Sequence, residues 1–201
     1  MAKPRGRPRQ FDSQAALNKA MLVFWEQGFS ATSLDDLGVA MGMNRPSIYN
    51  AFGSKEQIYR EALAQFSGKL DVGIANSLVK ESSLKKALTS FFDQALDVYC
   101  ANDPARGCFV MCTAPADALT HPDVKRDLGD LISRLDQKLE QRIKQAIKAG
   151  ELPAAINPRL MAMSIQATLH SLALRARAGE SKPTLKKFAR HAVQILPIGY
   201  G

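Results

Sequence analysis

The sequence predicts an all-α protein of about nine helices, and three observations support that fold class. Apolar residues recur at spacings of three and four along most of the chain, which is the helical period. No alternating apolar and polar run is long enough to indicate a strand. Capping residues, glycines and prolines stand where these patterns begin and end. With 201 residues, 46% of them hydrophobic, the chain can bury one sizeable core or two small ones.

The composition favours a nucleic-acid partner over a membrane or a disulfide framework. The formal net charge of +8 suits a polyanionic partner. No run approaches the ~18 apolar residues of a membrane span, and no apolar segment follows the charged start of the chain. Three cysteines are an odd number without framework spacing, which agrees with a reducing compartment. We therefore expect a cytoplasmic protein without a membrane segment.

Residues 1–11 are expected to form a flexible basic arm. The stretch "KPRGRPR" carries two prolines and a glycine, so it cannot be helical, and no acid accompanies its positive charges. One interpretation is a solvated, disordered terminus. The other is a minor-groove arm, because Arg5-Gly6-Arg7-Pro8 resembles the core of an AT-hook, in which arginines such as Arg5 and Arg7 enter a narrow groove.

Two helices are predicted between residues 12 and 42. Asp12 can cap the first, whose apolar positions include Leu17 and Phe24, and Gly28 suits its exit. Thr32 is expected to cap the second, with Asp35 three residues later approximating a capping box, and Gly42 is expected to end it.

A third short helix follows, and together with the second it makes a helix-turn-helix plan. Asn44 is a suitable cap, Pro46 falls in the first turn, and Ile48 with Phe52 forms an inward-facing pair. The polar and aromatic residues between them must therefore point outward, and these are Ser47, Tyr49 and Asn50. Two short helices joined by a glycine-containing turn, the second polar on its outer face, are typical of a major-groove reader.

The next helix is expected from Ser54 to about Phe66. Gln57 stands at the third position after Ser54, as in a capping box. Lys55 is a cation in the first turn, where it opposes the helix macrodipole. The position is more favourable if an external anion meets it, and DNA phosphate at a helix N-terminus is such an anion.

The stretch "TSLDDLGVAMGMNRPSIYNAFGSKEQIY", residues 32–59, resembles the DNA-binding signature of the TetR family of bacterial transcriptional regulators. The resemblance implies that the helix from Arg45 to Phe52 reads bases, while Thr32, Tyr49 and Lys55 hold phosphates. Pro46 and Ser47 lie on the same helix. Two residues depart from the family pattern. Gly38 stands where the family commonly has alanine, and Pro46 stands where it often has a small or polar residue. Residues 12–66 are thus expected to be the DNA-binding domain.

Residues 67–201 are expected to form a helical ligand-binding and dimerisation domain. A helix over 84–99 carries apolar residues on more than one stripe, and "GCFVMCTAPADAL" is apolar nearly all round until Pro115 ends or kinks it near residue 114. These segments are candidate walls of a pocket for an unknown, apolar or amphipathic small molecule. The candidate lining residues are Phe91, Phe92, Tyr99, Phe109 and Met111.

Three further helices are predicted, from about Pro122 to Ala149, after Asn157-Pro158, and after Lys182-Pro183. The helix over 158–178 is apolar around more of its circumference than one protomer face needs. The TetR resemblance implies a four-helix dimer interface made by the last two helices of each subunit, with Leu169, Leu172, Leu185 and Phe188 as candidates. An ordinary internal core is the alternative.

The remaining reactive residues give no catalytic pattern. Cys108 and Cys112 are one helical turn apart with Cys100 nearby, and they are either small core residues or a thiolate sensor for a soft metal or an oxidant. The three histidines form no triad or metal pair, and no P-loop or dinucleotide motif is present. We therefore expect no enzyme, no cofactor and no metal.

The main hypothesis is a homodimeric repressor that a ligand releases from a palindromic operator in double-stranded DNA. The alternatives are an architectural protein that binds AT-rich DNA and a cysteine-based redox or soft-metal sensor.

Overall fold

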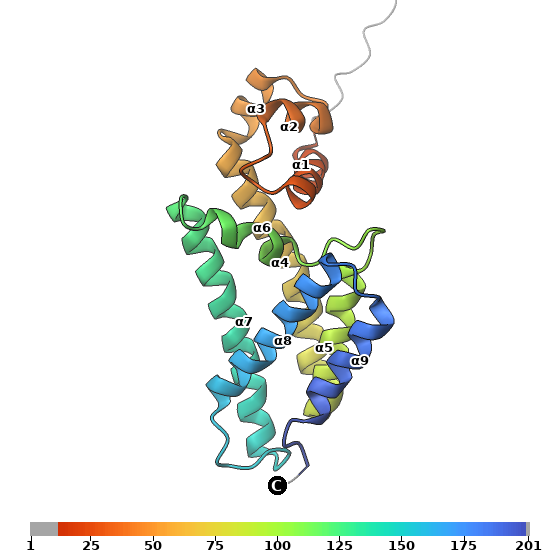
Figure 1. Cartoon of the computed structure of the whole chain (residues 1–201). Coiled ribbons are helices and arrows are strands. Elements are labelled where there is room, and N and C mark those ends of the chain that lie inside the picture. The colour runs from red at the N-terminus through yellow and green to blue at the C-terminus, as the bar shows by residue number, and fades with distance from the viewer. Residues whose placement is uncertain (1–11, 200–201) are drawn as a thin grey trace, which may run out of the picture.

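The computed structural model describes residues 12–199, and within that range it is all-α with nine helices and no strand. The helices are α1 (Ser13–Gln27), α2 (Leu34–Met41), α3 (Arg45–Phe52), α4 (Lys55–Lys80), α5 (Leu84–Tyr99), α6 (Phe109–Asp117), α7 (Pro122–Lys148), α8 (Pro158–Arg177) and α9 (Lys182–Gln194). Figure 1 shows α1–α3 as a small unit at one end, with α4 running from it into the larger bundle. None of the described helices is long and apolar enough to cross a membrane.

The first three helices begin at caps, and one of these differs from the expectation. Asp12 accepts from Ala15 N at 3.0 Å and caps α1, as predicted. The prediction of Thr32 as the cap of α2 is wrong, because Ser33 takes that place and forms a reciprocal capping box with Asp36. The Thr32 side chain is instead buried, and its hydroxyl donates to the Gly28 carbonyl at 2.6 Å.

The turn between α2 and α3 explains why a glycine stands at position 38. Met43 N in the turn donates to Gly38 O at 2.9 Å, so the turn backbone lies directly against α2. A Cβ on residue 38 would lie 2.8 Å from Met43 O, closer than such atoms normally approach. The low helix propensity of Gly38 is therefore offset by the tight turn that it permits.

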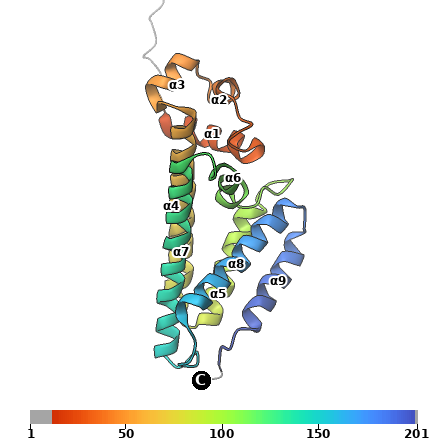
Figure 2. The ribbon, with the colours of Figure 1, turned by 60° about the vertical axis from the view of Figure 1, so that its left-hand side comes forward.

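The helix α4 is much longer than the sequence pattern suggested. It begins after the Ser54 cap, as predicted, but it continues past Phe66 to Lys80. Figure 2 shows α4 continuing from the small unit down into the bundle, with α8 and α9 to one side, and α5 is the helix that α4 contacts most extensively. The expected boundary at residues 66–67 thus falls inside one continuous helix that enters both parts of the molecule.

A cluster of aromatic side chains connects the small unit to the bundle, and we call it the aromatic joint: Trp25, Tyr59, Phe66 and Phe109. The Trp25 ring at the end of α1 lies 5.0 Å from the Phe66 ring of α4 and 5.7 Å from the Phe109 ring of α6. The Tyr59 ring lies 5.8 Å from Phe109, and its hydroxyl forms a 2.6 Å hydrogen bond with the Thr113 hydroxyl. Because these side chains are buried in one cluster, a displacement of α6 would also displace the side chains of α1 and α4 that pack against it.

Hydrogen bonds at the aromatic joint also connect the end of α1 to the loop before α6 and to the end of α8. Trp25 Nε1 donates to the Arg106 carbonyl at 3.1 Å, and Arg177 at the end of α8 donates to the Trp25 carbonyl at 2.9 Å. Cations near the last carbonyls of a helix are favourable because of the helix dipole. The loop before α6 also approaches α8 closely, since a Cβ on Gly107 would lie 2.4 Å from the Ala173 carbonyl oxygen.

Pro115 was expected either to end or to kink α6, and the structure contradicts the first of these two effects. The helix does not end near residue 114, because it continues through Pro115 to Asp117, and Ala118 N still donates to the Ala114 carbonyl at 3.0 Å. Proline removes only its own backbone donor, so the helix loses one hydrogen bond and continues.

Candidate nucleic-acid interface and ligand cavity

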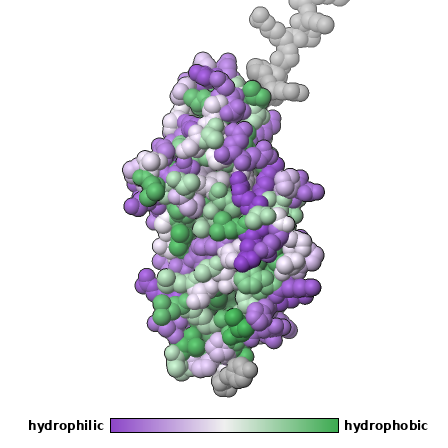
Figure 3. Space-filling view, in the orientation of Figure 1, coloured by the Kyte–Doolittle hydropathy of each residue, from purple (hydrophilic) through white to green (hydrophobic). Residues whose placement is uncertain are grey.

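The helix α3 presents a polar face at the end of the molecule that lies farthest from the bundle (Figure 1). Ile48 and Phe52 are buried against the small unit, as predicted. The opposite side is exposed, and it carries Pro46, Ser47, Tyr49 and Asn50. Tyr49 has 53% of its surface exposed, which is high for a large aromatic residue. Figure 3 shows a largely hydrophilic surface at this end of the molecule.

Arg45, the first residue of α3, is held by an acid of α2. Its Nε and Nη2 donate to the two carboxylate oxygens of Asp35 at 2.8 and 2.7 Å. The hydrogen bond from Arg45 lowers the pKa of Asp35, so the carboxyl stays ionised at neutral pH. An exposed pair of this kind contributes little to stability, because water and salt screen the attraction between the two charges. Arg45 can therefore exchange Asp35 for another acceptor at little cost. While the pair is formed, it fixes the orientation of the guanidinium and of the N–H groups that Asp35 does not use.

Lys55 makes contacts within the chain that the sequence did not reveal. Its Nζ donates to the carbonyls of Phe29 and Thr32, both at 2.9 Å, and lies 4.4 Å from the centre of the Phe29 ring. Lys55 thus ties the start of α4 to the connection between α1 and α2. One N–H of the ammonium is left for an external acceptor.

Three residues expected to contact DNA have a side chain that is already hydrogen-bonded within the chain or lie outside the described residues. The Thr32 side chain is buried and its hydroxyl donates to the Gly28 carbonyl, so a phosphate contact of Thr32 stays a prediction. Arg5 and Arg7 belong to residues outside the described range.

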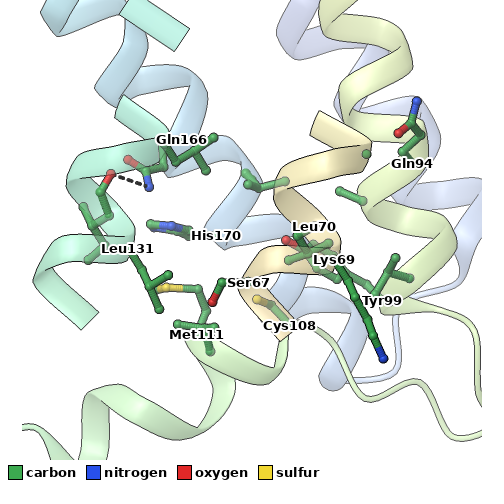
Figure 4. Close-up of a pocket in the computed structure, with 17 residues that line it drawn as sticks. Ser67, Lys69, Leu70, Gln94, Tyr99, Cys108, Met111, Leu131, Gln166 and His170 are labelled. Carbon is green, nitrogen blue, oxygen red and sulfur yellow. Dashed lines mark hydrogen bonds between the residues drawn. The ribbon is translucent and has the colours of Figure 1, made fainter. Parts of the chain in front are cut away.

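A cavity of about 140 Å³ lies in the bundle between α4, α5, α6, α7 and α8. Figure 4 shows its lining side chains. Tyr99 and Met111 line it, as predicted. Phe91, Phe92 and Phe109 do not, so their assignment to the pocket is corrected: Phe91 and Phe92 pack on each other at 5.1 Å, and Phe109 belongs to the aromatic joint. A buried aromatic residue looks the same in a sequence whether it faces a core or a cavity.

Sequence reasoning missed the cavity walls that α7 and α8 supply. They include Leu131, Leu135, Gln166, Leu169 and His170. The available signal was a pair of polar residues one helical turn apart in α8, Gln166 and His170, whereas nothing in the pattern of α7 distinguishes Leu131 from its neighbours.

The cysteines are electrostatically unsuited to act as thiolates at neutral pH. Cys108 is buried at the cavity, and burial raises its pKa to about 11. Burial also raises the pKa of the Cys100 and Cys112 thiols. The described residues contain no group of three metal-ligating side chains. These thiols are protonated near pH 7, and the protonated form is a weak nucleophile and metal ligand.

Three of the four candidate dimer residues are internal to the protomer. Leu172 and Leu185 are fully buried and Leu169 is 5% exposed, so their assignment to a dimer interface is corrected. Only Phe188 reaches the surface, where the Arg175 guanidinium lies 5.4 Å from its ring centre. Other apolar side chains of α8 and α9 and the end of the chain are more exposed, namely Leu160, Met163, Leu174 and Ile195.

Comparison with known proteins agrees with this geometry. Residues 16–62 match the family model described as bacterial regulatory proteins, tetR family, and residues 85–192 match the model described as tetracyclin repressor-like, C-terminal domain. The HTH-type transcriptional repressor ComR of Escherichia coli (strain K12) is 29% identical over 97% of this chain and 93% of its own length.

Solved structures give the same result. A cysteine mutant of the TetR family regulator CifR, complexed with 26 bp double-strand operator DNA, superposes with a TM-score of 0.85 at 28% identity, covering 96% of this chain and all of that one. The reduced form of E. coli NemR shares the fold, with a TM-score of 0.81 at 17% identity over 94% of this chain and 97% of that one. Since the C-terminal model alone matches more than half of the sequence, the chain belongs to the TetR family of bacterial transcriptional regulators.

Proposed function

We propose that this protein is a homodimeric repressor that binds a two-fold-symmetric operator and leaves it when a small molecule occupies the cavity. The observation that carries the proposal is the continuous helix α4. Its first residue, Lys55, is hydrogen-bonded to the connection between α1 and α2. Farther along the same helix, the cavity is lined by Ser67, Leu70 and Gly73. A ligand that displaces this helix acts directly on the orientation of α3.

The proposed DNA contacts divide into two classes. Asn50, Ser47 and Arg45 belong to the exposed side or the start of α3 and can contact base edges, where amide and guanidinium groups pair with adenine and guanine respectively. Tyr49, which is exposed, and the remaining N–H of Lys55 are proposed to contact phosphates. Arg5 and Arg7 are proposed to reach the adjacent minor groove.

The proposed dimer face is the exposed side of α8 and α9. Met163, Leu174, Phe188 and Ile195 are between 36% and 68% exposed, which leaves substantial apolar surface on two adjacent helices. A second copy related by a two-fold axis would cover this surface with the same helices. The two α3 helices would then point the same way and fit two half-sites of one duplex.

Release follows if the ligand prefers a dimer geometry that does not fit DNA. The ligand must then bind DNA-free protein more tightly than DNA-bound protein, by the same factor by which it weakens operator affinity. The aromatic joint around Trp25 and Phe109 gives α6 a second route to α1, in addition to α4.

Binding-site selection followed by footprinting tests the proposal. We expect a pseudo-palindrome with half-sites about one helical turn, roughly 34–36 Å, apart, and affinity that falls steeply with salt because counterions are released from phosphates. Leu174→Asp is the matched variant, because it leaves α3 intact while placing a charge on the proposed dimer face. Uniform binding to AT-rich DNA, or an asymmetric single half-site, contradicts the proposal and favours an architectural role.

A further inference from the structure

We propose that the cavity takes a small uncharged molecule with an apolar body about the size of one ring and a single hydroxyl, such as a phenol or an aromatic alcohol, and that His170 recognises this hydroxyl. The inference rests on the proposed function, since it names the ligand class of the same site.

The described residues that line the cavity favour an uncharged ligand over an ionic one. No aspartate or glutamate is among the described residues that line the cavity, and Lys69 is their only permanent cation. Lys69 is exposed, and its Nζ lies 3.3 Å from Asn18 Oδ1, so it stands at the mouth and not in the interior. An anion or a cation inside would lose its hydration without gaining a counter-charge, which is strongly unfavourable.

The volume and the walls fix the size and polarity of the body. The cavity measures about 140 Å³. An engineered cavity of about 150 Å³ in another protein binds benzene, so one aromatic ring is the appropriate scale. The walls are mostly aliphatic or thioether side chains, including Leu70, Val98, Met111, Leu131, Leu135 and Leu169. A ring with one or two small substituents fills such a space and buries its apolar surface.

Most of the polar groups around the cavity already have partners. The Ser67 hydroxyl donates to the Leu63 carbonyl, and Gln166 Nε2 donates to the Ile132 carbonyl at 3.3 Å. Tyr99 and Cys108 are both buried, and burial raises the pKa of each group. The Ser67 hydroxyl and the Gln166 amide are thus held in place by carbonyls of the protein and are less free to select a ligand.

His170 differs from these groups. No hydrogen bond joins its ring to another residue in the part of the chain that the structure describes. Figure 4 shows the ring between Gln166 and Met111, facing the space that the lining residues enclose. Burial lowers the pKa of His170, so the ring is neutral near pH 7 and offers one donor and one acceptor. A ligand hydroxyl can satisfy either of them.

The test compares two ligands that differ by one hydroxyl. Calorimetric titration of the DNA-free protein with toluene and p-cresol gives the affinity ratio of the pair. We expect the p-cresol preference to fall about tenfold in His170→Leu, because the buried hydroxyl loses its partner, while toluene still binds. His170→Gln should restore part of the preference, since an amide also donates and accepts. His191→Leu is the matched control and should leave the ratio unchanged, because His191 is exposed on α9 and is not among the described residues that line the cavity.

A second pair tests charge. Benzamide should bind more tightly than benzoate, which has nearly the same shape but carries a negative charge. Tighter binding of benzoate, or an equal p-cresol preference in the parent protein and His170→Leu, overturns the proposal, as does the absence of toluene and p-cresol binding at millimolar concentration. Toluene binding to His170→Leu also shows that this variant is folded around an intact cavity.

Failure of the ligand class can be told apart from failure of the proposed function. Operator affinity is measured separately, with and without p-cresol. If p-cresol binds in a His170-dependent manner but operator affinity is unchanged, the ligand class stands and ligand-driven release is refuted. If operator binding responds to other compounds while p-cresol and toluene do not bind, release stands and the ligand class is refuted.

Discussion

Substituting Lys55 by methionine separates a structural role from a phosphate contact. In the DNA-free protein the Lys55 ammonium donates to two carbonyls, those of Phe29 and Thr32, and lies against the Phe29 ring. Methionine keeps most of the unbranched stem but removes the charge and all three donors. If the contacts within the chain matter, the small unit is destabilised even when no DNA is present.

The magnitude follows from the two hydrogen bonds. A hydrogen bond to a charged group contributes about 1.5–3 kcal/mol. Lys55 is only half-buried, so water can partly replace the ammonium at the freed carbonyls. We therefore expect the free energy of unfolding to fall by about 2–3 kcal/mol in total, including the lost attraction to the Phe29 ring. With a urea m-value of about 2 kcal/mol/M, the unfolding midpoint should fall by about 1 M.

Urea denaturation monitored by circular dichroism, together with operator binding at zero urea, decides the matter. Lys125→Met is the control, because Lys125 is exposed on α7 and lies outside the helix-turn-helix. An unchanged midpoint with a large loss of operator affinity would refute the structural role and leave Lys55 as a phosphate contact alone.

Three other changes test the remaining assignments. Asn50→Ala should change the preferred bases in a selection experiment, at about 1–3 kcal/mol for a lost base contact, whereas Tyr49→Phe should weaken binding to all sequences alike. Gly38→Val should lower the free energy of unfolding in urea by about 1–3 kcal/mol, because the new Cβ would lie 2.8 Å from Met43 O; an unchanged midpoint would show that the turn can open freely. Because the pKa of Cys108 is raised to about 11, the unfolded chain loses this proton first as pH rises above about 9. This thiol alone should lower the free energy of unfolding by about 1.4 kcal/mol for each pH step of one between pH 9 and 11, and the other buried thiols and tyrosines with raised pKa add to that decline. Cys108→Ala should flatten that decline in urea titrations at several pH values, and identical pH profiles would show an ordinary thiol.

Local patterns were sufficient for the helices and for the outward face of α3. Asp12, Asn44 and Ser54 are caps in the structure, as predicted, because a cap depends on a side chain and a backbone N–H only three residues apart. The inward pair Ile48 and Phe52 follows from the helical period, and it fixes which residues of α3 face solvent. The prediction that Thr32 caps α2 was wrong because its hydroxyl donates to the Gly28 carbonyl in the preceding turn, and Ser33 is the cap instead.

Longer-range contacts decided what the same residues do. The sequence could place Lys55 and Arg45 on helix starts, but it could not show that carbonyls of the α1–α2 connection or the Asp35 carboxylate would hold their charges. The helix α4 extends beyond Phe66 although glycines at positions 68 and 73 weaken its helical signal. Packing of α4 against neighbouring helices in the bundle stabilises that second half, and packing is not encoded within one turn.

The sequence by itself determined the fold class, the helix-turn-helix and its polar outer face, because those depend on the period of apolar residues and on caps within one turn of each other. The tertiary structure alone decided which apolar residues enclose a cavity and which fill the core. Leu172 is buried in the core, whereas His170 on the same helix faces the cavity together with Leu131 of α7. The physical reason is that burial depends on how all the helices pack together. The hydrophobicity of a side chain predicts that it will be buried away from water, but it does not determine which residues or which cavity it will face.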